Sequence, residues 1–220
     1  MSLSTPYARH MPPTKDRYHH GALREELLRA CLQLIDTEGL AAVSLRRVAR
    51  EAGVSPGAPY HHFADRAALL AALSARGFDL LTARLAAARA AAPTPIGSLT
   101  TLADAYVRFA QDQPAYFRLM FRPELSQPDK NPEARAAGDA AFAVLADTIA
   151  EIVAEGALPA AEADAVAVAA WSMAHGLAAL AIDGQLTKRA DQLGTTAPDL
   201  GGRITRLFAD LIEARARDRI

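Results

Sequence analysis

The amino-acid sequence predicts an all-α protein of about nine helices, with a small N-terminal three-helix domain followed by a larger helical domain. Apolar residues recur at intervals of three and four along most of the 220 residues. Proline and glycine separate these periodic segments, as they do between helices. No stretch shows the alternation of apolar and polar residues that is typical of a half-buried strand. With 51% hydrophobic residues, the chain can bury a substantial core.

The first helix is predicted from His20 to Glu38, where Gly39 provides a normal C-terminal stop. Residues 1–19 contain three prolines and are predicted to form a flexible arm. This arm either contacts DNA phosphates or the minor groove, as some N-terminal arms do, or is a disordered leader, which is the favoured interpretation. The single Cys31 lies on the apolar face of the helix and is interpreted as a buried structural thiol.

The run from Ser44 to Phe63 predicts a helix, a three-residue turn and a second helix. The hydroxyl of Ser44 can cap the first of these helices. Its apolar face has the spacing i, i+3, i+4 and i+7, formed by Leu45, Val48, Ala49 and Ala52. Gly53 suits the sharp turn because glycine reaches positive φ without strain. Ser55 is the predicted cap of the second helix, and Pro56 suits its first position.

The rest of the chain predicts six further helices separated by proline- and glycine-containing loops. They cover roughly residues 65–92, 97–112, a short segment opening at Pro114, 133–155, 160–183 and 199–218. Loops are expected at 122–132 and 184–198. A helix over 65–92 would be about 40 Å long, so it would belong to both domains.

A helix, turn and helix of this kind places its second helix in the DNA major groove. The residues Gly53-Val54-Ser55, then Gly57, then Tyr60-His61-His62-Phe63, closely resemble the TetR family of transcriptional regulators over residues 21–82. The resemblance implies an all-helical homodimer that binds double-stranded operator DNA. It assigns residues 20–66 to a helix-turn-helix domain and residues 67–220 to effector binding and dimerisation.

Predicted DNA contacts come from three places: the start of the first helix of the motif, the second helix of the motif, and the first residue of the helix that follows the motif. They are Ser44, Arg46, Arg47, Ser55, Pro56, Gly57, Ala58, Tyr60, His61, His62 and Arg66. The fork of an arginine such as Arg46 fits guanine O6 and N7. The resemblance implies phosphate contacts from Tyr60 and His62, a base or backbone contact from His61, and a clamp completed by Arg66. Solvated helix faces are the alternative for Arg46 and Arg47.

Pro59 departs from the family pattern, which usually has leucine or another apolar residue at this position. Proline there removes the first intrahelical hydrogen bond and crowds the carbonyl of Ser55. The first turn of the recognition helix is therefore predicted to be distorted or 3₁₀-like. Phe63 is predicted to belong to the core.

Aromatic residues and methionines are concentrated in the C-terminal part, where helical spacing ordinarily indicates a core. The resemblance implies in addition an apolar effector pocket among the helices between residues 97 and 183. Its predicted lining consists of Tyr106, Phe109, Tyr116, Phe117, Met120, Phe142, Leu145, Trp171 and His175. The spacing of Trp171, His175 and Gly176 resembles a Trp-His-Gly subclass of the family. The expected ligand is a small apolar or aromatic effector.

Alanines recur along the 160–183 helix and would let another helix approach closely. Together with the apolar stripe of the 199–218 helix, they suit a four-helix interface with a second copy. Packing within one monomer is the alternative. Dimerisation is favoured because two reading heads are needed for two half-sites.

Charge and composition exclude several classes of protein. Residues 1–66 hold nine Lys or Arg and seven Asp or Glu, whereas the remainder holds 15 and 18, for a net charge of −1. A weakly basic head on an acidic body fits a DNA reader carried by a second domain. No apolar run long enough for a membrane helix and no signal core are evident, so a cytoplasmic protein without a membrane partner is expected. No catalytic residue, cofactor or metal is assigned, because no catalytic set, metal-ligand cluster or phosphate loop is visible.

The sequence therefore predicts a ligand-responsive transcriptional regulator. The resemblance implies a repressor, the most frequent role in this family, that binds a palindromic operator as a homodimer. The alternative is a small-molecule-binding helical protein or enzyme with no specific DNA binding. A third possibility is a TetR-like protein whose head has lost its affinity for DNA, for which Pro59 is the reason.

Overall fold

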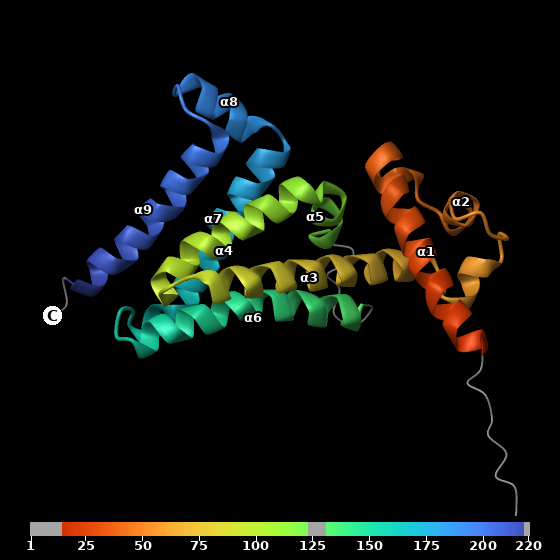
Figure 1. Ribbon diagram of the computed structural model, residues 1–220, viewed down its shortest axis with the longest axis horizontal. Helices are drawn as coiled ribbons and strands as arrows, with labels where there is room; N and C mark the ends of the chain where they lie inside the picture. The colour runs from red at the N-terminus through yellow and green to blue at the C-terminus, as the bar shows by residue number, and fades with distance from the viewer. Residues whose placement is uncertain (1–14, 123–130, 218–220) are drawn as a thin grey trace, which may run out of the picture.

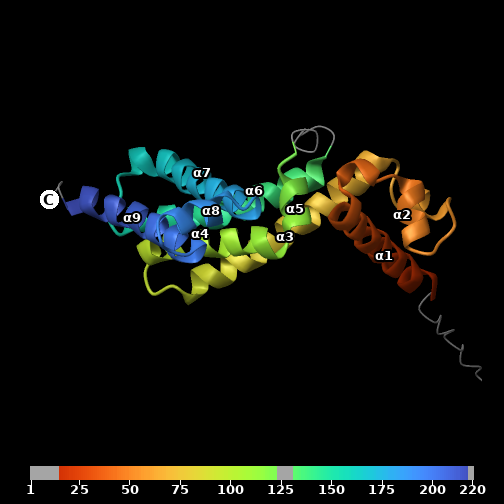
Figure 2. The same ribbon diagram turned by 90° about the horizontal axis from the view of Figure 1, so that it is seen from above.

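The computed structural model describes residues 15–122 and 131–217. Within these residues it contains nine α-helices, three short 3₁₀ helices and no strand, which confirms the all-α prediction. The molecule is elongated, with a small head at one end and a larger helical body at the other (Figure 1). Seen from above, α1 and α2 occupy one end, and α9 reaches the other (Figure 2).

The head consists of α1 (Lys15–Glu38), the 3₁₀ helix η1 (Leu40–Ala42), α2 (Leu45–Glu51) and the 3₁₀ helix η2 (Ala58–His61). Leucine and valine side chains from α1 and α2 fill its interior, and Phe63 is buried there as predicted. Cys31 of α1 is fully buried, and burial raises the pKa of its thiol to about 12. The interpretation of Cys31 as a buried thiol is therefore confirmed.

Helix α3 (Arg66–Ala91) leaves the head and runs through the body beside α6 (Figure 1). Asp65 caps it, since its carboxylate accepts a hydrogen bond of 2.8 Å from the backbone N–H of Ala68. One cluster of buried apolar side chains continues from α1 and α2 through the first turns of α3 into α4 and α5. Head and body thus share α3 and a continuous core.

Six helices join α3 in the body: α4 (Pro95–Asp112), α5 (Pro114–Met120), α6 (Pro132–Ala154), α7 (Ala163–Ile182), α8 (Gln185–Gln192) and α9 (Ala197–Arg217). The 3₁₀ helix η3 (Ala160–Glu162) precedes α7. Helix α3 packs along α6, and α4 packs along both α7 and α9. A second buried cluster, which includes Ile149 and Ile152, lies among α4, α6, α7 and α9.

The structure corrects two predicted segments. Helix α1 begins at Lys15, so the prediction of a flexible arm is wrong for residues 15–19, and the predicted arm residues 1–14 lie outside the described residues. The predicted loop at 184–198 contains α8, because Leu186 and Ala190 lie one turn apart and are both buried. Most of the loop predicted at 122–132 lies outside the described residues, and α6 begins at Pro132.

Helix α7 is strongly apolar, although most of it is not buried in this chain. The segment Ala160–Ile182 has a mean hydropathy of 1.8 in its most apolar window, but only 28% of that window is buried. By length and composition this segment could cross a membrane, so the expectation that no such segment exists is wrong. Leu180 of α7 and Leu207 and Leu211 of α9 are also exposed, which leaves an apolar face uncovered.

Gly77 allows α5 to pack very closely against α3. A Cβ atom at this position would lie 2.7 Å from Met120 Sδ and 2.9 Å from Tyr116 Cδ1. The same addition at Gly138 on α6 would meet only the Phe78 ring at an ordinary 3.5 Å. The absence of a side chain at Gly77 therefore fixes the distance between the two helices.

We predict that Gly77→Ala lowers the free energy of unfolding by about 1–3 kcal/mol relative to Gly138→Ala, because only the first overpacks a closed contact. The gain in helix propensity is the same at both positions and cancels in the comparison. Urea unfolding of the two variants measures the difference. Equal stabilities would contradict the close contact between α3 and α5.

Candidate functional site

Helix α2 begins as the sequence predicts. The Ser44 hydroxyl accepts a hydrogen bond of 3.2 Å from the backbone N–H of Arg47, which makes Ser44 the N-cap. Arg46 is exposed, and no hydrogen bond or ion pair to its side chain is present among the described residues. The guanidinium of Arg47 instead pairs with Glu38 at the end of α1. The structure therefore presents Arg46 to solvent and uses Arg47 to join two helices of the head.

A Schellman motif ends α2. Gly53 has a φ of 68°, a left-handed conformation that favours glycine. The N–H of Val54 donates to the carbonyl of Ala49 at 2.9 Å, and the N–H of Gly53 donates to that of Arg50 at 3.2 Å. This pair of bonds fixes the direction in which the chain leaves α2.

The recognition element is a four-residue 3₁₀ helix, η2, rather than a longer α-helix. Pro59 cannot donate to the carbonyl of Ser55, and this carbonyl accepts from the N–H of Ala58 at 3.0 Å instead. The prediction of a 3₁₀-like turn is confirmed. The roles predicted for Ser55 as the cap and Pro56 as the first helical residue are wrong, because the helix begins at Ala58 after Gly57.

The side chains of η2 divide between the core and solvent. Pro59 is buried, so it takes the inward position of an apolar residue. Tyr60 is 54% exposed and His61 is exposed, whereas Ala58 and His62 are half-buried. Ser55, Pro56 and Gly57, which precede η2, are exposed as well. An exposed surface thus continues from Arg46 across the turn to Tyr60 and His61.

Arg66 acts as a strut inside the head. Its Nε and a terminal nitrogen each donate a hydrogen bond of 2.9 Å, to the carbonyls of Val43 and Leu40 respectively. The first residue of α3 therefore holds the segment that leads into Ser44 and α2. A phosphate contact from Arg66 remains a prediction.

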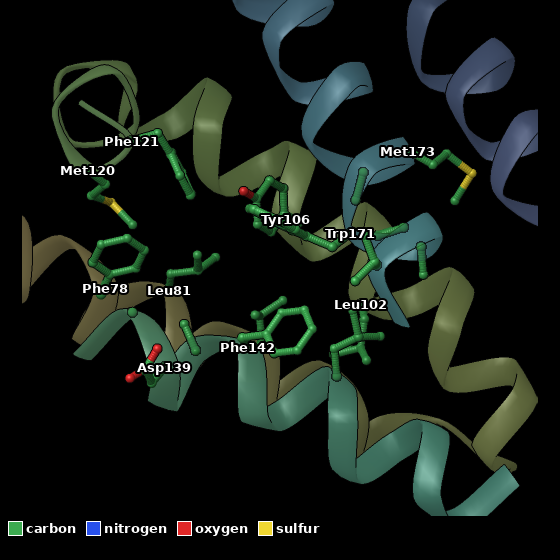
Figure 3. Close-up of a pocket in the computed structure, with 18 of the residues that line it drawn as sticks. Phe78, Leu81, Leu102, Tyr106, Met120, Phe121, Asp139, Phe142, Trp171 and Met173 are labelled. Carbon is green, nitrogen blue, oxygen red and sulfur yellow. The ribbon is translucent and has the colours of Figure 1, made fainter. Parts of the chain in front are cut away.

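The body contains a partly open apolar cavity of about 560 Å³. Its walls come from α3, α4, α5, α6, α7 and α9. Figure 3 shows Phe78, Met120 and Phe121 at one end, Leu102 and Trp171 toward the other, and Tyr106 and Phe142 between them. Cavities of this size and composition are typical of small-molecule binding sites.

Five of the predicted lining residues border this cavity: Tyr106, Met120, Phe142, Leu145 and Trp171. Phe109, Tyr116, Phe117 and His175 do not border it, and the first three of these are buried in the surrounding core. The sequence analysis missed the wall formed by α3, whose Ser74, Phe78, Leu81 and Leu85 share one helical stripe. In the sequence this stripe looks the same as an ordinary core stripe, because only the structure shows the cavity beside it.

His175 lies behind the cavity wall and supports Tyr106. Its Nδ1 is 2.9 Å from the Tyr106 hydroxyl. Its ring stacks on Phe117 with centroids 5.1 Å apart and meets Phe121 edge-on at 4.6 Å. Burial lowers the pKa of His175 and raises that of the Tyr106 hydroxyl, which the neighbouring Trp171 opposes in part. The lowered pKa favours the neutral imidazole, and its Nδ1 and the tyrosine hydroxyl share one hydrogen bond.

Comparisons with known proteins agree with this arrangement. Residues 27–73 match the family model of bacterial regulatory proteins of the tetR family. Residues 99–200 match the model of a tetracyclin repressor-like C-terminal domain. Among curated proteins, none matches the chain.

Solved structures extend the similarity over most of the chain. A protein of unknown function from Rhodococcus sp. RHA1 is 33% identical, with a TM-score of 0.74 over 89% of this chain and 98% of its own. PfmR from Thermus thermophilus, a TetR family transcriptional regulator, is 22% identical, with a TM-score of 0.62 over 86% and 97%. A TetR family regulator from Marinobacter aquaeolei VT8 is 18% identical, with a TM-score of 0.61 over 77% and 88%. The last two similarities concern the fold alone.

An exposed helix-turn-helix head that shares α3 and a continuous core with a cavity-containing helical body is the arrangement of a DNA-binding regulator. The chain belongs to the TetR family of DNA-binding transcriptional regulators. Family and fold point to a transcriptional regulator rather than to an enzyme. The individual DNA and ligand contacts assigned from the sequence remain predictions.

The lowered pKa of His175 predicts a pH dependence of stability. As the pH falls below about 6.5, the unfolded chain binds a proton at this position before the folded protein does, so acid destabilises the fold. We expect a smaller drop in melting temperature between pH 7.5 and pH 5.5 for His175→Gln than for the unmodified protein. Differential scanning fluorimetry measures the drop. His61→Gln, at an exposed position, is the control, and an unchanged drop in His175→Gln would contradict the prediction.

Proposed function

We propose that this protein is a cytoplasmic, ligand-responsive repressor that binds a palindromic operator as a homodimer and has no membrane partner. The observation that carries this proposal is the connection between its two sites. Helix α3 begins at the Arg66 strut of the head and contributes four residues to the cavity wall. A change at the cavity can therefore reach the DNA-binding surface through one continuous helix.

The exposed surface from Arg46 to His61 supports the DNA-binding part of the proposal. Arg46 provides a charged fork for a base or a phosphate, and Tyr60 and His61 provide donors at the tip of the head. Because residues three apart share a face in a 3₁₀ helix, Tyr60 lies above Gly57 and His61 above Ala58. The small residues at these two positions allow close approach to the DNA backbone.

The uncovered apolar face of α7 and α9 supports the homodimer. Large exposed apolar patches on a folded chain indicate an interface. Glu162 and Asp164 lie at the start of the segment 160–182, and charged residues oppose insertion into lipid, so a second copy is the better cover for its apolar face. An interface of α7 and α9 with the same helices of the partner is self-complementary, as a twofold axis requires. The twofold axis in turn suits a palindromic operator.

The cavity supports the response to a ligand. An effector changes the affinity for DNA only if it binds two conformations of the protein with different affinities. The cavity is suited to this because its walls come from α3 and also from five helices of the body. A ligand that alters the packing of α3 against α5 and α6 would alter the position of the head.

The DNA-binding proposal predicts that Arg46→Ala weakens operator binding at least tenfold, because a charged contact to base or phosphate is lost. The operator is the palindrome enriched by the unmodified protein from a random DNA pool, and fluorescence anisotropy gives the affinity. Arg108→Ala is the matched control, since Arg108 is exposed on α4, outside the head, and pairs with Asp104 of the same helix. Equal affinities of Arg46→Ala and Arg108→Ala would contradict the assignment, and failure to enrich any sequence would contradict operator binding.

The dimer proposal predicts that the double variant Leu207→Asp/Leu211→Asp is a monomer. Both leucines are about 60% exposed on α9, and charges there would have to be buried on association. Light scattering coupled to size exclusion distinguishes the 23.4 kDa chain from twice that mass. Leu80→Asp, on α3 and 44% exposed, is the control that should remain dimeric. A monomeric unmodified protein would overturn the proposal.

A further inference from the structure

Ser74 carries a buried hydroxyl whose hydrogen bonds are not made. The residue is 1% exposed, and its Oγ has no hydrogen-bond partner among the residues that the structure describes. It borders the cavity from α3, on the same stripe as Phe78, Leu81 and Leu85. A buried polar group that lacks a partner costs free energy, so such groups are rare in folded proteins and call for an explanation.

Three other buried or half-buried hydroxyls on helices of the body are satisfied within their own helix. Thr82, Ser98 and Thr148 each donate to the carbonyl four residues earlier, at 2.9, 3.1 and 2.9 Å. This bond to the preceding turn is the usual arrangement for serine and threonine inside a helix. Ser74 lies in the middle of a regular helix and does not make it. Its hydroxyl therefore remains available to a group inside the cavity.

The remaining polar groups of the wall restrict what that group can be. The Tyr106 hydroxyl is already bonded to His175. Arg135 and Asp139 are exposed, and their side chains lie 3.6 Å apart on α6. No charged side chain is buried in the described wall. Because Arg135 and Asp139 pair with each other at the exposed side of the wall, a carboxylate or ammonium group beside Ser74 would lose hydration without gaining a buried counter-charge.

We propose that Ser74 is the anchor for the polar group of the ligand, and that this ligand is an uncharged molecule with an apolar body and one hydroxyl or carbonyl group. The stripe from Ser74 to Leu85 covers about 16 Å along α3. The apolar body of the ligand therefore lies along α3, past Leu81 and Tyr106 and toward Leu102 and Trp171 (Figure 3). This inference rests on the proposed use of the cavity as the ligand site.

Trp171 provides the measurement, since it is the single tryptophan of the chain and borders the cavity. The unmodified protein is titrated at pH 7.5, without DNA, with 1-octanol, 2-octanone, octanoate and octylammonium. We expect a saturable change in Trp171 fluorescence with the two uncharged probes, and at least tenfold weaker binding of the two charged probes. Absence of a saturable change with both uncharged probes, or equal binding of octanoate, overturns the proposed ligand class.

Two serine variants test the anchor. Ser74→Ala is expected to bind 1-octanol about tenfold more weakly while keeping or raising the melting temperature of the free protein, because an unsatisfied hydroxyl is removed. Ser98→Ala is the matched control: Ser98 is a buried serine on α4 that bonds to the carbonyl of Thr94 and lies outside this cavity. It should bind 1-octanol as the unmodified protein does. If Ser74→Ala binds 1-octanol equally well, or if it loses stability as an already satisfied hydroxyl would, the anchor role is overturned.

The same titrations separate this inference from the proposed regulatory function. Because ligand binding is measured without DNA, binding of 1-octanol that depends on Ser74 supports the anchor even if operator affinity does not respond. In that case the ligand-responsive repressor is contradicted and the anchor stands. Conversely, release of the operator by 1-octanol from Ser74→Ala and the unmodified protein at the same concentration would overturn the anchor and leave the regulator intact.

Discussion

The packing of α3 is the constraint on which the rest of the structure depends. This 26-residue helix is about 40 Å long, and its first turns lie in the core of the head while its later turns border the cavity. The cap from Asp65 and the two hydrogen bonds from Arg66 fix its start against the segment that leads into α2. The head therefore cannot change its orientation independently of the helix that forms one wall of the cavity.

A second route joins the two parts through α5. Met120 borders the cavity and also lies against Gly77, and Tyr116 of the same short helix packs on that glycine too. Arg76, the residue before Gly77, pairs with Glu25 of α1. Protein interiors are closely packed, so a displacement of Met120 must be taken up by its neighbours. The junction between head and body is thus a packed contact with little free space.

Much of the fold follows from local signals that sequence analysis can recognise. Capping by Ser44 and Asp65 and the turn at Gly53 each depend on residues within one helical turn, and all are present. The predicted roles of Ser55 and Pro56 fail because the backbone constraint of Pro59 overrides two favourable local propensities. The strut formed by Arg66 joins it to carbonyls 23 and 26 residues earlier, a relation that no local pattern contains. Likewise, the stripe that includes Ser74 differs from an ordinary core stripe only through the empty space beside it.

Two features of the isolated chain carry unfavourable free energy that binding would remove. One is the apolar face of α7 and α9, which is exposed to water in a single copy. The other is the hydroxyl of Ser74, which is removed from water without a partner. A sequence selected for the stability of the isolated chain alone would have polar residues on the exposed face of α7 and α9 and alanine at position 74. The retention of both features is consistent with a chain whose working state includes a second copy and a molecule in the cavity, and this argues against the isolated, empty chain as the functional form.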